Sequence, residues 1–322
     1  MSALQVKNLC YFYDRKTSNE KEALIDVSMD IEQGEIIALV GKTGSGKSTL
    51  VQNIDALLTP TTGVITYPNG IVVDQTPVVK KNGKVKYKKP KKLKDWKSLR
   101  KMIGLMFQFS EMQLFETSVL KDVMVGPENF GMDKGTAQTN AQNALLSVGI
   151  PTSYFSRSPF ELSGGEKRRV AIAGILAFNP EILILDEPTV GLDPEGAKEI
   201  MDSIMAKNAE GMTIVFITHD MEFALKNAHR MAVISDGKLI AYKKPYEIFQ
   251  DQEVMDKASL VPPKAFEYAL KLKEGGLDID LEKVKDSKSL AEEIKRCRVW
   301  TDLDLLDSMS HSTHLFIEWM QE

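Results

Sequence analysis

Residues 41–49 form a glycine-rich segment of a kind that binds phosphate groups. The segment reads Gly-Lys-Thr-Gly-Ser-Gly-Lys-Ser-Thr and lies between an apolar run at 36–40 and a helical pattern at 50–58. A buried strand, a glycine-rich turn and a helix start together direct backbone N–H groups at a phosphate. An ordinary glycine-rich connection is the alternative, but the full pattern predicts a nucleoside triphosphate site. The candidate binding residues are Gly41, Thr43, Gly44, Ser45, Gly46, Lys47, Ser48 and Thr49.

Four residues of this segment have distinct expected tasks. Gly44 and Gly46 permit a tight turn and let backbone N–H groups approach phosphate oxygens, where a Cβ atom would clash. Lys47 can reach the β and γ phosphates, and the Ser48 hydroxyl can ligate Mg²⁺. The segment therefore suits a triphosphate that carries a magnesium ion.

An acidic pair, Asp186 and Glu187, follows the apolar run at 182–185. We expect this run to be a central strand that is buried on both faces. Carboxylates at the carboxyl end of such a strand lie where ligands bind in open α/β sheets. Asp186 is placed to hold Mg²⁺ through its water shell, and Glu187 to polarise an attacking water as a general base. A solvated acidic turn is the alternative, which this position disfavours.

Gln108 and His219 each follow a predicted buried strand, at 103–107 and 213–217 respectively. A glutamine at a strand end can sense a metal ion or an attacking water, although most such residues are surface amides. A lone histidine is most often structural. His219 lies at the same predicted sheet edge as Asp186 and Glu187, so we expect it to contact the γ phosphate.

A second glycine-containing helix start lies at residues 163–166, ahead of a helical pattern at 167–178. Ser163 is a good N-cap, and Gly164 and Gly165 leave the first helical N–H groups unobstructed. Glu166 completes the motif. These features predict a second anion-binding helix N-terminus, with plain helix capping as the alternative.

The remaining pattern indicates an α/β fold with a parallel central sheet. Asp193 and Pro194 suit the N-cap and first position of a helix that ends near residue 208. Tyr11 and Tyr13 lie at the edge of the first hairpin and could stack on an adenine ring, but spacing alone favours ordinary strand packing. Further strands are expected at 4–13, 23–31, 231–235 and 238–242, and helices at 95–101, 116–130, 133–148, 264–273 and 289–298.

Two segments carry no recognisable chemistry. Residues 80–101 are rich in lysine around a turn at 82–83, which favours a solvated hairpin over a surface that contacts anionic lipids. The pattern weakens beyond about residue 252 and ends in an amphipathic piece at 316–320. We expect this C-terminal part to be an accessory region that makes oligomer contacts, or else a tail that packs on its own domain.

Composition limits the classes of function. The net charge of −4 over 322 residues argues against general nucleic-acid binding, so no nucleic-acid partner is expected. Cys10 and Cys297 match no metal-binding spacing, which indicates a reduced, cytosolic compartment. We identify no signal peptide and no apolar run of about 18 residues, so any membrane spans would belong to another chain.

The order of these motifs resembles that of ABC transporter ATPases over residues 3–250. The resemblance is carried by the phosphate loop, Gln108, the Leu-Ser-Gly-Gly-Glu signature at 162–166, the strand with its acidic pair, the turn at 191–194 and His219. It implies a P-loop NTPase of the ABC ATPase type. This type has a RecA-like core, an antiparallel β subdomain and an α-helical subdomain. We therefore expect an ATPase domain at 1–250, its helical subdomain at about 110–178, and the accessory region at 251–322.

The resemblance also implies roles for individual residues and for a partner. Tyr13, with Tyr11 as a near alternative, would stack on adenine; Gln108 would be the Q-loop glutamine that contacts Mg²⁺. Glu187 would be the catalytic carboxylate, and His219 the switch histidine. The D-loop residue would be Asp193. The signature residues Ser163, Gly164, Gly165 and Glu166 would act on ATP held by a second ATPase subunit.

Within that family the chain is most similar to the ATP-binding subunits of energy-coupling factor (ECF) transporters. The carrying segments are 107–116, 125–131, 168–174 and 261–278. They imply a peripheral ATPase at the cytoplasmic face of the cell membrane that drives uptake of a vitamin or other micronutrient, such as cobalt or nickel. Its partners would be a second ATPase subunit, a transmembrane coupling subunit and substrate-binding membrane subunits. The resemblance favours a paralogue as the second ATPase subunit, with a homodimer as the alternative. Another ABC transporter, or a soluble ABC-type mechanical ATPase, is the alternative.

Overall fold

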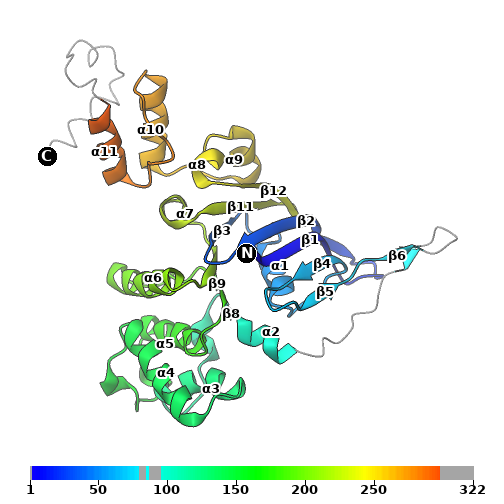
Figure 1. Ribbon diagram of the computed structural model, residues 1–322, viewed down its shortest axis with the longest axis vertical. Helices are drawn as coiled ribbons and strands as arrows, with labels where there is room; N and C mark the ends of the chain where they lie inside the picture. The colour runs from blue at the N-terminus through cyan, green and yellow to red at the C-terminus, as the bar shows by residue number, and fades with distance from the viewer. Residues whose placement is uncertain (1, 80–84, 87–95, 298–322) are drawn as a thin grey trace.

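The computed structural model describes residues 2–79, 85–86 and 96–297 (Figure 1). Most of the predicted lysine-rich hairpin, with its turn at 82–83, lies outside these residues, as does the predicted amphipathic piece at 316–320. The described strands are β1 (Ser2–Tyr13), β2 (Lys21–Glu32), β3 (Ile36–Val40), β4 (Thr62–Thr66), β5 (Val72–Asp74), β6 (Val78–Val79), β7 (Val85–Lys86), β8 (Ile103–Met106), β9 (Ile182–Asp186), β10 (Thr213–Ile217), β11 (Arg230–Ser235) and β12 (Lys238–Lys243).

Helices account for most of the other described residues. The α-helices are α1 (Lys47–Ile54), α2 (Trp96–Met102), α3 (Val119–Asn129), α4 (Lys134–Ser147), α5 (Gly164–Leu176), α6 (Pro194–Ala209), α7 (Met221–Asn227), α8 (Pro245–Ile248), α9 (Gln252–Ala258), α10 (Lys264–Glu274) and α11 (Ser287–Arg296). Short 3-10 helices are η1 (Ser110–Gln113), η2 (Thr152–Tyr154) and η3 (Pro159–Glu161).

A six-stranded sheet in the order β12-β11-β3-β10-β9-β8 forms the centre of the molecule. Its strands run parallel except for β12, which pairs antiparallel with β11 at one edge. β3 and β10 are buried at every residue, as contiguous apolar runs are in a parallel sheet that is covered on both faces. Because the strands are parallel, β3, β8, β9 and β10 all end at one edge. The phosphate loop, Gln108, Glu187 and His219 follow these ends.

A second, antiparallel sheet has the order β2-β1-β4-β5. Its predicted first hairpin is confirmed: β1 and β2 pair from Ser2 opposite Glu32 to Tyr13 opposite Lys21. α1 shares one hydrophobic cluster with both sheets, through Leu50 and Ile54 among others. The helix that follows the phosphate loop is therefore held from two sides.

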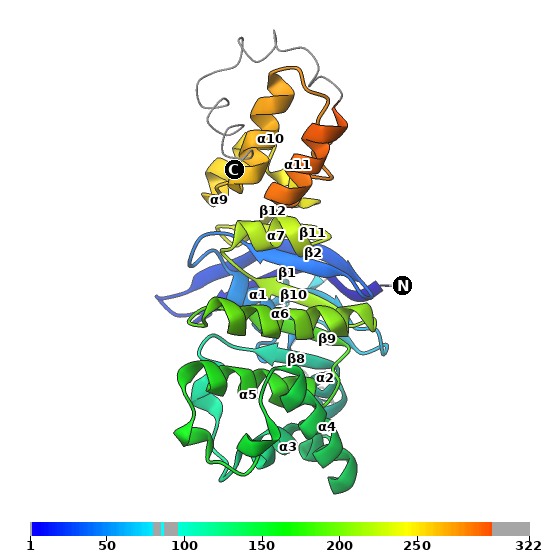
Figure 2. The same ribbon diagram turned by 90° about the vertical axis from the view of Figure 1, so that its left-hand side faces the viewer.

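Two further hydrophobic clusters cover the rest of the central sheet. The second joins alternate residues of β9 and β10 to α3, α4, α5 and α6. The third cluster joins β3 and β11 to α7–α11. It includes residues on both sides of position 250, and the domain boundary predicted there stays a prediction. The helices α3–α5 and α9–α11 lie at opposite ends of the molecule (Figure 2). β3 contributes to all three clusters, with Ile36 in the second, Ile37 and Leu39 in the first, and Ala38 and Val40 in the third.

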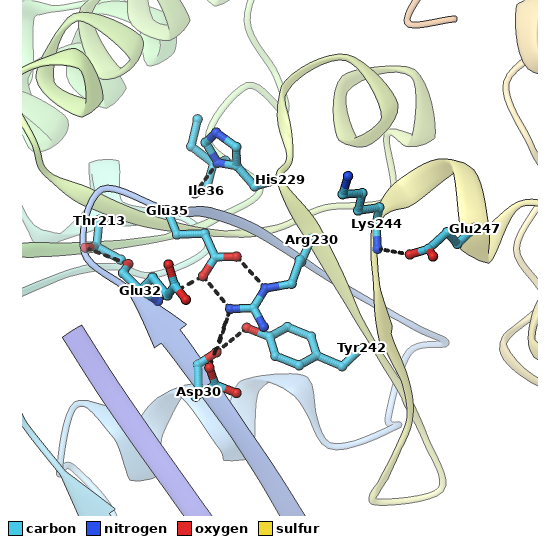
Figure 3. Close-up of polar contacts among 10 residues, drawn as sticks. All are labelled: Asp30, Glu32, Glu35, Ile36, Thr213, His229, Arg230, Tyr242, Lys244 and Glu247. Carbon is cyan, nitrogen blue, oxygen red and sulfur yellow. Dashed lines mark hydrogen bonds and ion pairs between the residues drawn. The ribbon is translucent and has the colours of Figure 1, made fainter. Parts of the chain in front are cut away.

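A cluster of polar residues joins the two sheets at their edge (Figure 3). We call it the Arg230 cluster, and it consists of Asp30, Glu35, Arg230 and Tyr242. The Arg230 guanidinium donates to both Glu35 carboxylate oxygens, at 2.5 and 2.6 Å, and to the Asp30 carbonyl oxygen at 3.0 Å. It lies 4.2 Å from the centroid of the Tyr242 ring, whose hydroxyl donates to the same Asp30 carbonyl at 2.5 Å. The Glu35 hydrogen bonds raise the pKa of Arg230. The cluster thus fixes β2 against β11 and β12.

Several predicted element boundaries are wrong. The helix predicted at 50–58 is α1, which begins at Lys47 and ends at Ile54, because Ala56 adopts a left-handed φ of 54°. The helix predicted at 167–178 is α5, which begins at Gly164, directly after the Ser163 cap, and ends at Leu176. The short helices α7, α8 and α9 are not predicted at all, since four to seven residues are too few to show helical periodicity.

Candidate active site

The phosphate loop is closely surrounded by backbone on one side and open on the other. Gly46 has a φ of 112°, and a Cβ atom there would lie 2.7 Å from the Ala23 carbonyl oxygen. Gly44 has a φ of 79° and nothing within 4 Å of its Cβ position. The expected clash at Gly46 is therefore with the protein's own β2, whereas the space beside Gly44 is free for a ligand.

Lys47 and Ser45 point polar atoms into this loop. The Lys47 ammonium donates to the carbonyl oxygens of Gly41 and Lys42, at 2.7 and 2.9 Å. Burial lowers the pKa of Lys47, and the nearby Asp186 and Glu187 charges oppose that shift. The Ser45 hydroxyl is buried and has no hydrogen-bond partner among the described residues. A buried hydroxyl without a partner is costly, and a phosphate oxygen would satisfy it.

A cavity of about 470 Å³ opens beside the loop. The Tyr13 hydroxyl and the Thr49 hydroxyl at its wall are 3.1 Å apart. Tyr11 contacts Tyr13 edge to face, with ring centroids 4.9 Å apart, but it packs on the first hydrophobic cluster and does not line the cavity. Only Tyr13 of the two therefore faces the space next to the loop. The cavity is lined by Tyr13, Lys21, Glu22, Ala23, Gly44, Gly46, Lys47, Ser48, Thr49, Asp236 and Gly237.

The structure brings three predicted catalytic side chains together at the ends of β8, β9 and β10. One carboxylate oxygen of Glu187 lies 3.4 Å from His219 Nε2, and the other accepts from Gln108 Nε2 at 3.5 Å. Asp186 directly precedes Glu187. Burial raises the pKa of the Asp186 carboxyl group, and the Glu187 charge raises that pKa further, while the Lys47 charge opposes the shift. The side chains can thus surround one small reactant next to the phosphate loop.

Glu187 has an unusual backbone conformation. Its φ is 50°, in the left-handed region, which costs a non-glycine residue about 1–3 kcal/mol. Hydrogen bonds hold the strained peptide: the Glu187 N–H donates to the Ile217 carbonyl at 3.0 Å, and the Glu187 carbonyl accepts from Arg168 Nη2. The strain is therefore maintained by β10 on one side and by α5 on the other.

The signature residues form a complete capping box at the start of α5. The Ser163 hydroxyl accepts from the Glu166 N–H at 3.4 Å, and the Glu166 carboxylate accepts from the Ser163 N–H at 2.7 Å. These hydrogen bonds lower the pKa of Glu166. Ser163 and Gly164 are exposed, and no signature residue lines the cavity beside Lys47. Within one chain the second glycine motif is thus separate from the phosphate loop.

Asp193 has the predicted capping position. Its carboxylate accepts from the Gly196 N–H at 3.1 Å, and Pro194 is the first residue of α6. Its expected D-loop role stays a prediction.

Sequence reasoning missed two contributors to the site. The turn at Asp236 and Gly237 lines the cavity, and the Gly237 N–H donates to the Ser45 carbonyl at 2.9 Å. Arg168 contacts the main chain of Glu187 and Pro188. The turn gives no signal beyond its hairpin pattern. Arg168 does give one, because it lies four residues before Ile172, on the same buried face of α5.

Comparison with known proteins agrees with this arrangement. A family model described as ABC transporter matches residues 24–190. The energy-coupling factor transporter ATP-binding protein EcfA2 of Mycoplasmopsis synoviae is 41% identical over 281 residues, which cover 86% of this chain and 90% of that protein. The EcfA2 protein of Streptococcus pneumoniae is 42% identical over 289 residues, which cover 88% of this chain and 98% of that protein.

Solved structures show the same fold. The protein cbiO1 from Clostridium perfringens, part of the ABC transporter complex cbiONQ, matches with a TM-score of 0.62 and 35% identity, over 80% of this chain and 94% of that one. An ATP-binding cassette solved as a dimer in a post-hydrolysis state with ADP and Pi matches with a TM-score of 0.63 and 27% identity, over 75% of this chain and 98% of that one.

The fold and the site define an ABC ATPase, a P-loop NTPase with an antiparallel β subdomain and a helical subdomain. The chain belongs to the ABC transporter family and, within it, to the energy-coupling factor transporter ATP-binding proteins. It is an ATP-binding and ATP-hydrolysing subunit. Among the described residues, none of the helices has the length and apolar character that a membrane span needs.

Proposed function

We propose that this chain hydrolyses magnesium-bound ATP at the edge of its central sheet and thereby drives an ECF-type importer. The observation that carries the proposal is the convergence of Gln108, Glu187 and His219 at the ends of three strands. In this arrangement Glu187 accepts a proton from the attacking water, and Gln108 and His219 fix its carboxylate. Before that step, when ATP binds, Lys47 exchanges its loop carbonyls for the β and γ phosphates.

The donor atoms beside the loop suit Mg²⁺. The Ser48 hydroxyl, the Gln108 amide oxygen and the Asp186 carboxylate are hard oxygen ligands, and Mg²⁺ commonly takes one or two carboxylates together with substrate phosphates. The described residues contain no group of three or more His, Cys, Asp or Glu side chains that could hold a metal ion. When bound, Mg²⁺ would neutralise charge on the β and γ phosphates.

A complete site requires two ATPase subunits. The signature helix start is exposed and lies away from the cavity of its own chain, so it is available to ATP held by a partner. Helix N-termini favour anions, and Ser163, Gly164 and Gly165 would close on the γ phosphate there. ATP would then bridge the subunits, and hydrolysis would release them. The similarity to EcfA2 proteins favours a paralogous partner over a second copy, although a homodimer is compatible with the site.

The other proposed partners lie in the membrane. The cbiO1 protein is part of a cbiONQ complex, which supports a transmembrane coupling subunit and substrate-binding membrane subunits for this chain as well. The segment after Gln108 exposes Phe109, Met112 and Phe115, by 53, 80 and 64%, which suits contact with a membrane subunit at the cytoplasmic face. The transported compound would be a vitamin or other micronutrient that the membrane subunits select.

The test is a Glu187→Gln variant, assayed for phosphate release with its partner subunits. Removing the general base should lower kcat by about a hundredfold or more and leave ATP bound. Glu181→Gln is the matched control and should keep normal activity, because Glu181 is exposed and lies directly before β9, at the opposite end from Glu187. Unchanged hydrolysis in Glu187→Gln would refute the assignment.

A further inference from the structure

We infer that Arg168 is a positioning residue, whose guanidinium aims the Glu187 carboxylate and links it mechanically to Glu111. The inference rests on the proposed function, in which Glu187 activates water. Arg168 lies on α5, two residues after the signature motif, and is only 5% exposed. Its buried charge faces neither the nucleotide cavity nor solvent, so its role must come from the groups that it contacts.

All three guanidinium nitrogens of Arg168 face acceptor atoms. Nε donates to the Pro188 carbonyl oxygen at 2.9 Å, and Nη2 donates to the Glu187 carbonyl oxygen. Nη1 lies 3.9 Å from the Glu111 carboxylate. A guanidinium presents these donors in a fixed plane, so the two successive carbonyl groups are held in one orientation. A lysine ammonium, as a point charge on a mobile stem, has no such fork.

The peptide that Arg168 holds is the strained one. Glu187 has a φ of 50°, a conformation that persists only when surrounding contacts impose it. Its carboxylate lies 3.4 Å from His219 and 3.5 Å from Gln108, at the outer limit of hydrogen bonding. A small rotation of the backbone would therefore break both contacts. Arg168 prevents that rotation without touching the reactants.

The third contact connects this peptide to the segment after Gln108. Glu111 lies in η1, and its carboxylate oxygen nearest Arg168 is buried and has no hydrogen-bond partner among the described residues. The Arg168 charge is therefore the interaction that balances it. The exposed residues Phe109 and Met112 flank Glu111. A partner that displaces this segment would pull on Glu111, then on Arg168, and so on the Glu187 backbone.

The first experiment measures steady-state hydrolysis by Arg168→Gln in the full chain with its partner subunits. We expect kcat to fall about tenfold to a hundredfold, because small misplacements of a catalytic group have effects of that size. The KM for ATP and the affinity for ADP should stay within about twofold of the unmodified chain, since Arg168 does not line the cavity. Arg157→Gln removes an exposed guanidinium from the same part of the chain and should leave kcat unchanged. A normal kcat in Arg168→Gln, or an equal loss of nucleotide affinity, would overturn the inference.

The second experiment separates positioning from a general structural role. In a Glu187→Gln background, Arg168→Gln should cause no further loss of hydrolysis, because both changes act through one carboxylate. Losses that multiply would contradict the inference. If Arg168→Gln does not fold, Arg168→Lys serves instead: it should show a reduced kcat with normal ADP affinity, and a normal kcat would overturn the inference.

The third measurement tests the link to Glu111. Glu111→Gln should lower kcat severalfold in the unmodified chain and have no effect in the Arg168→Gln background. An equal effect in both backgrounds would overturn the link. The outcomes also separate this inference from the proposed function. Normal hydrolysis by Glu187→Gln would refute the proposed function itself, whereas an inactive Glu187→Gln with a fully active Arg168→Gln would refute only the role of Arg168.

Discussion

At the scale of single residues, Glu187 shows how side-chain chemistry and backbone geometry combine. Its side chain meets Gln108 and His219, while its peptide is held in a left-handed conformation by neighbouring strands and a buried arginine. A carboxylate on a relaxed strand end would continue along β9 and point elsewhere. The chemistry therefore depends on main-chain hydrogen bonds as much as on the acidic group.

Asp55 gives a prediction about pH. It directly follows α1, is 6% exposed, and burial raises the pKa of its carboxyl group to about 7, against the opposing charge of Arg100. Because the pKa in the folded chain lies above that in the unfolded chain, the stabilising effect of protonation is complete at low pH and is lost as pH rises through about 7. Asp55→Asn should therefore raise the free energy of unfolding at pH 8, by at most on the order of 4 kcal/mol, and change it little near pH 4.

Urea unfolding at the two pH values measures this effect. The control is Asp202→Asn, an exposed carboxylate on α6, which should show no comparable gain at pH 8. A gain in Asp55→Asn that is the same at both pH values would contradict the assignment.

The catalytic residues predicted from the sequence lie at the ends of strands. Gln108, Asp186, Glu187 and His219 could be located because contiguous apolar runs define strands, and parallel strands end at one edge. Arg168 could not be assigned this role, because its contacts lie directly after β9 and in η1, distant in sequence from α5. The left-handed backbone at Glu187 likewise has no signature in residue type, since a glutamate does not favour it.

At the scale of elements, the serine N-caps of two α-helices offer a direct comparison. Ser163 caps α5 and Ser118 caps α3, each accepting from the N–H three residues on at 3.4 Å. Replacing either by alanine should remove about 1 kcal/mol of stability. Only Ser163 belongs to the proposed partner-facing site, so only Ser163→Ala should lose hydrolysis beyond what its stability change explains.

Thermal unfolding and phosphate release, measured on both variants with the partner subunits present, test this prediction. We expect the two variants to have equal midpoints of thermal unfolding, and only Ser163→Ala to release phosphate more slowly. If Ser118→Ala loses as much activity as Ser163→Ala, the signature helix start has no role beyond capping.

Element identities were more predictable than element ends. The strands at 36–40 and 213–217 coincide with β3 and β10, because apolar character stops where each strand leaves the core. The end of α1 was not predictable, since it depends on a left-handed residue at Ala56, which no residue preference suggests. Beyond residue 252 the hydrophobic periodicity of the sequence is weak, although α9, α10 and α11 bury residues in the third cluster. Their apolar residues are divided among three helices of 7, 11 and 10 residues, each too short to show a strong periodicity.

At the scale of the whole molecule, the Arg230 cluster fixes the antiparallel sheet against the central one. Arg230→Met would keep the contact with the Tyr242 ring but remove the cation that pairs with the mostly buried Glu35 carboxylate, which would then accept only from the Glu32 N–H. We expect a loss of about 2–3 kcal/mol in the free energy of unfolding, because a charged group loses its two hydrogen bonds to Arg230.

Chemical denaturation gives the measurement, and an exposed ion pair gives the control. Lys207→Met breaks the pair with Glu210, which is 2.8 Å long and solvent-accessible, and should cost less than about 1 kcal/mol. Similar losses in the two variants would mean that the Arg230 cluster contributes no more than a surface contact.

β3 is five residues long, yet its side chains enter all three hydrophobic clusters, and the phosphate loop begins directly after its last residue. The position of the loop therefore depends on all three hydrophobic clusters, because a change in the packing of any one of them can displace β3. Residues 41–49 grafted into another scaffold would consequently keep the sequence of the motif but lose its backbone conformation. Conversely, substitutions remote from ATP, even in α9–α11, can change the affinity for the nucleotide, because these helices pack in one cluster with β3.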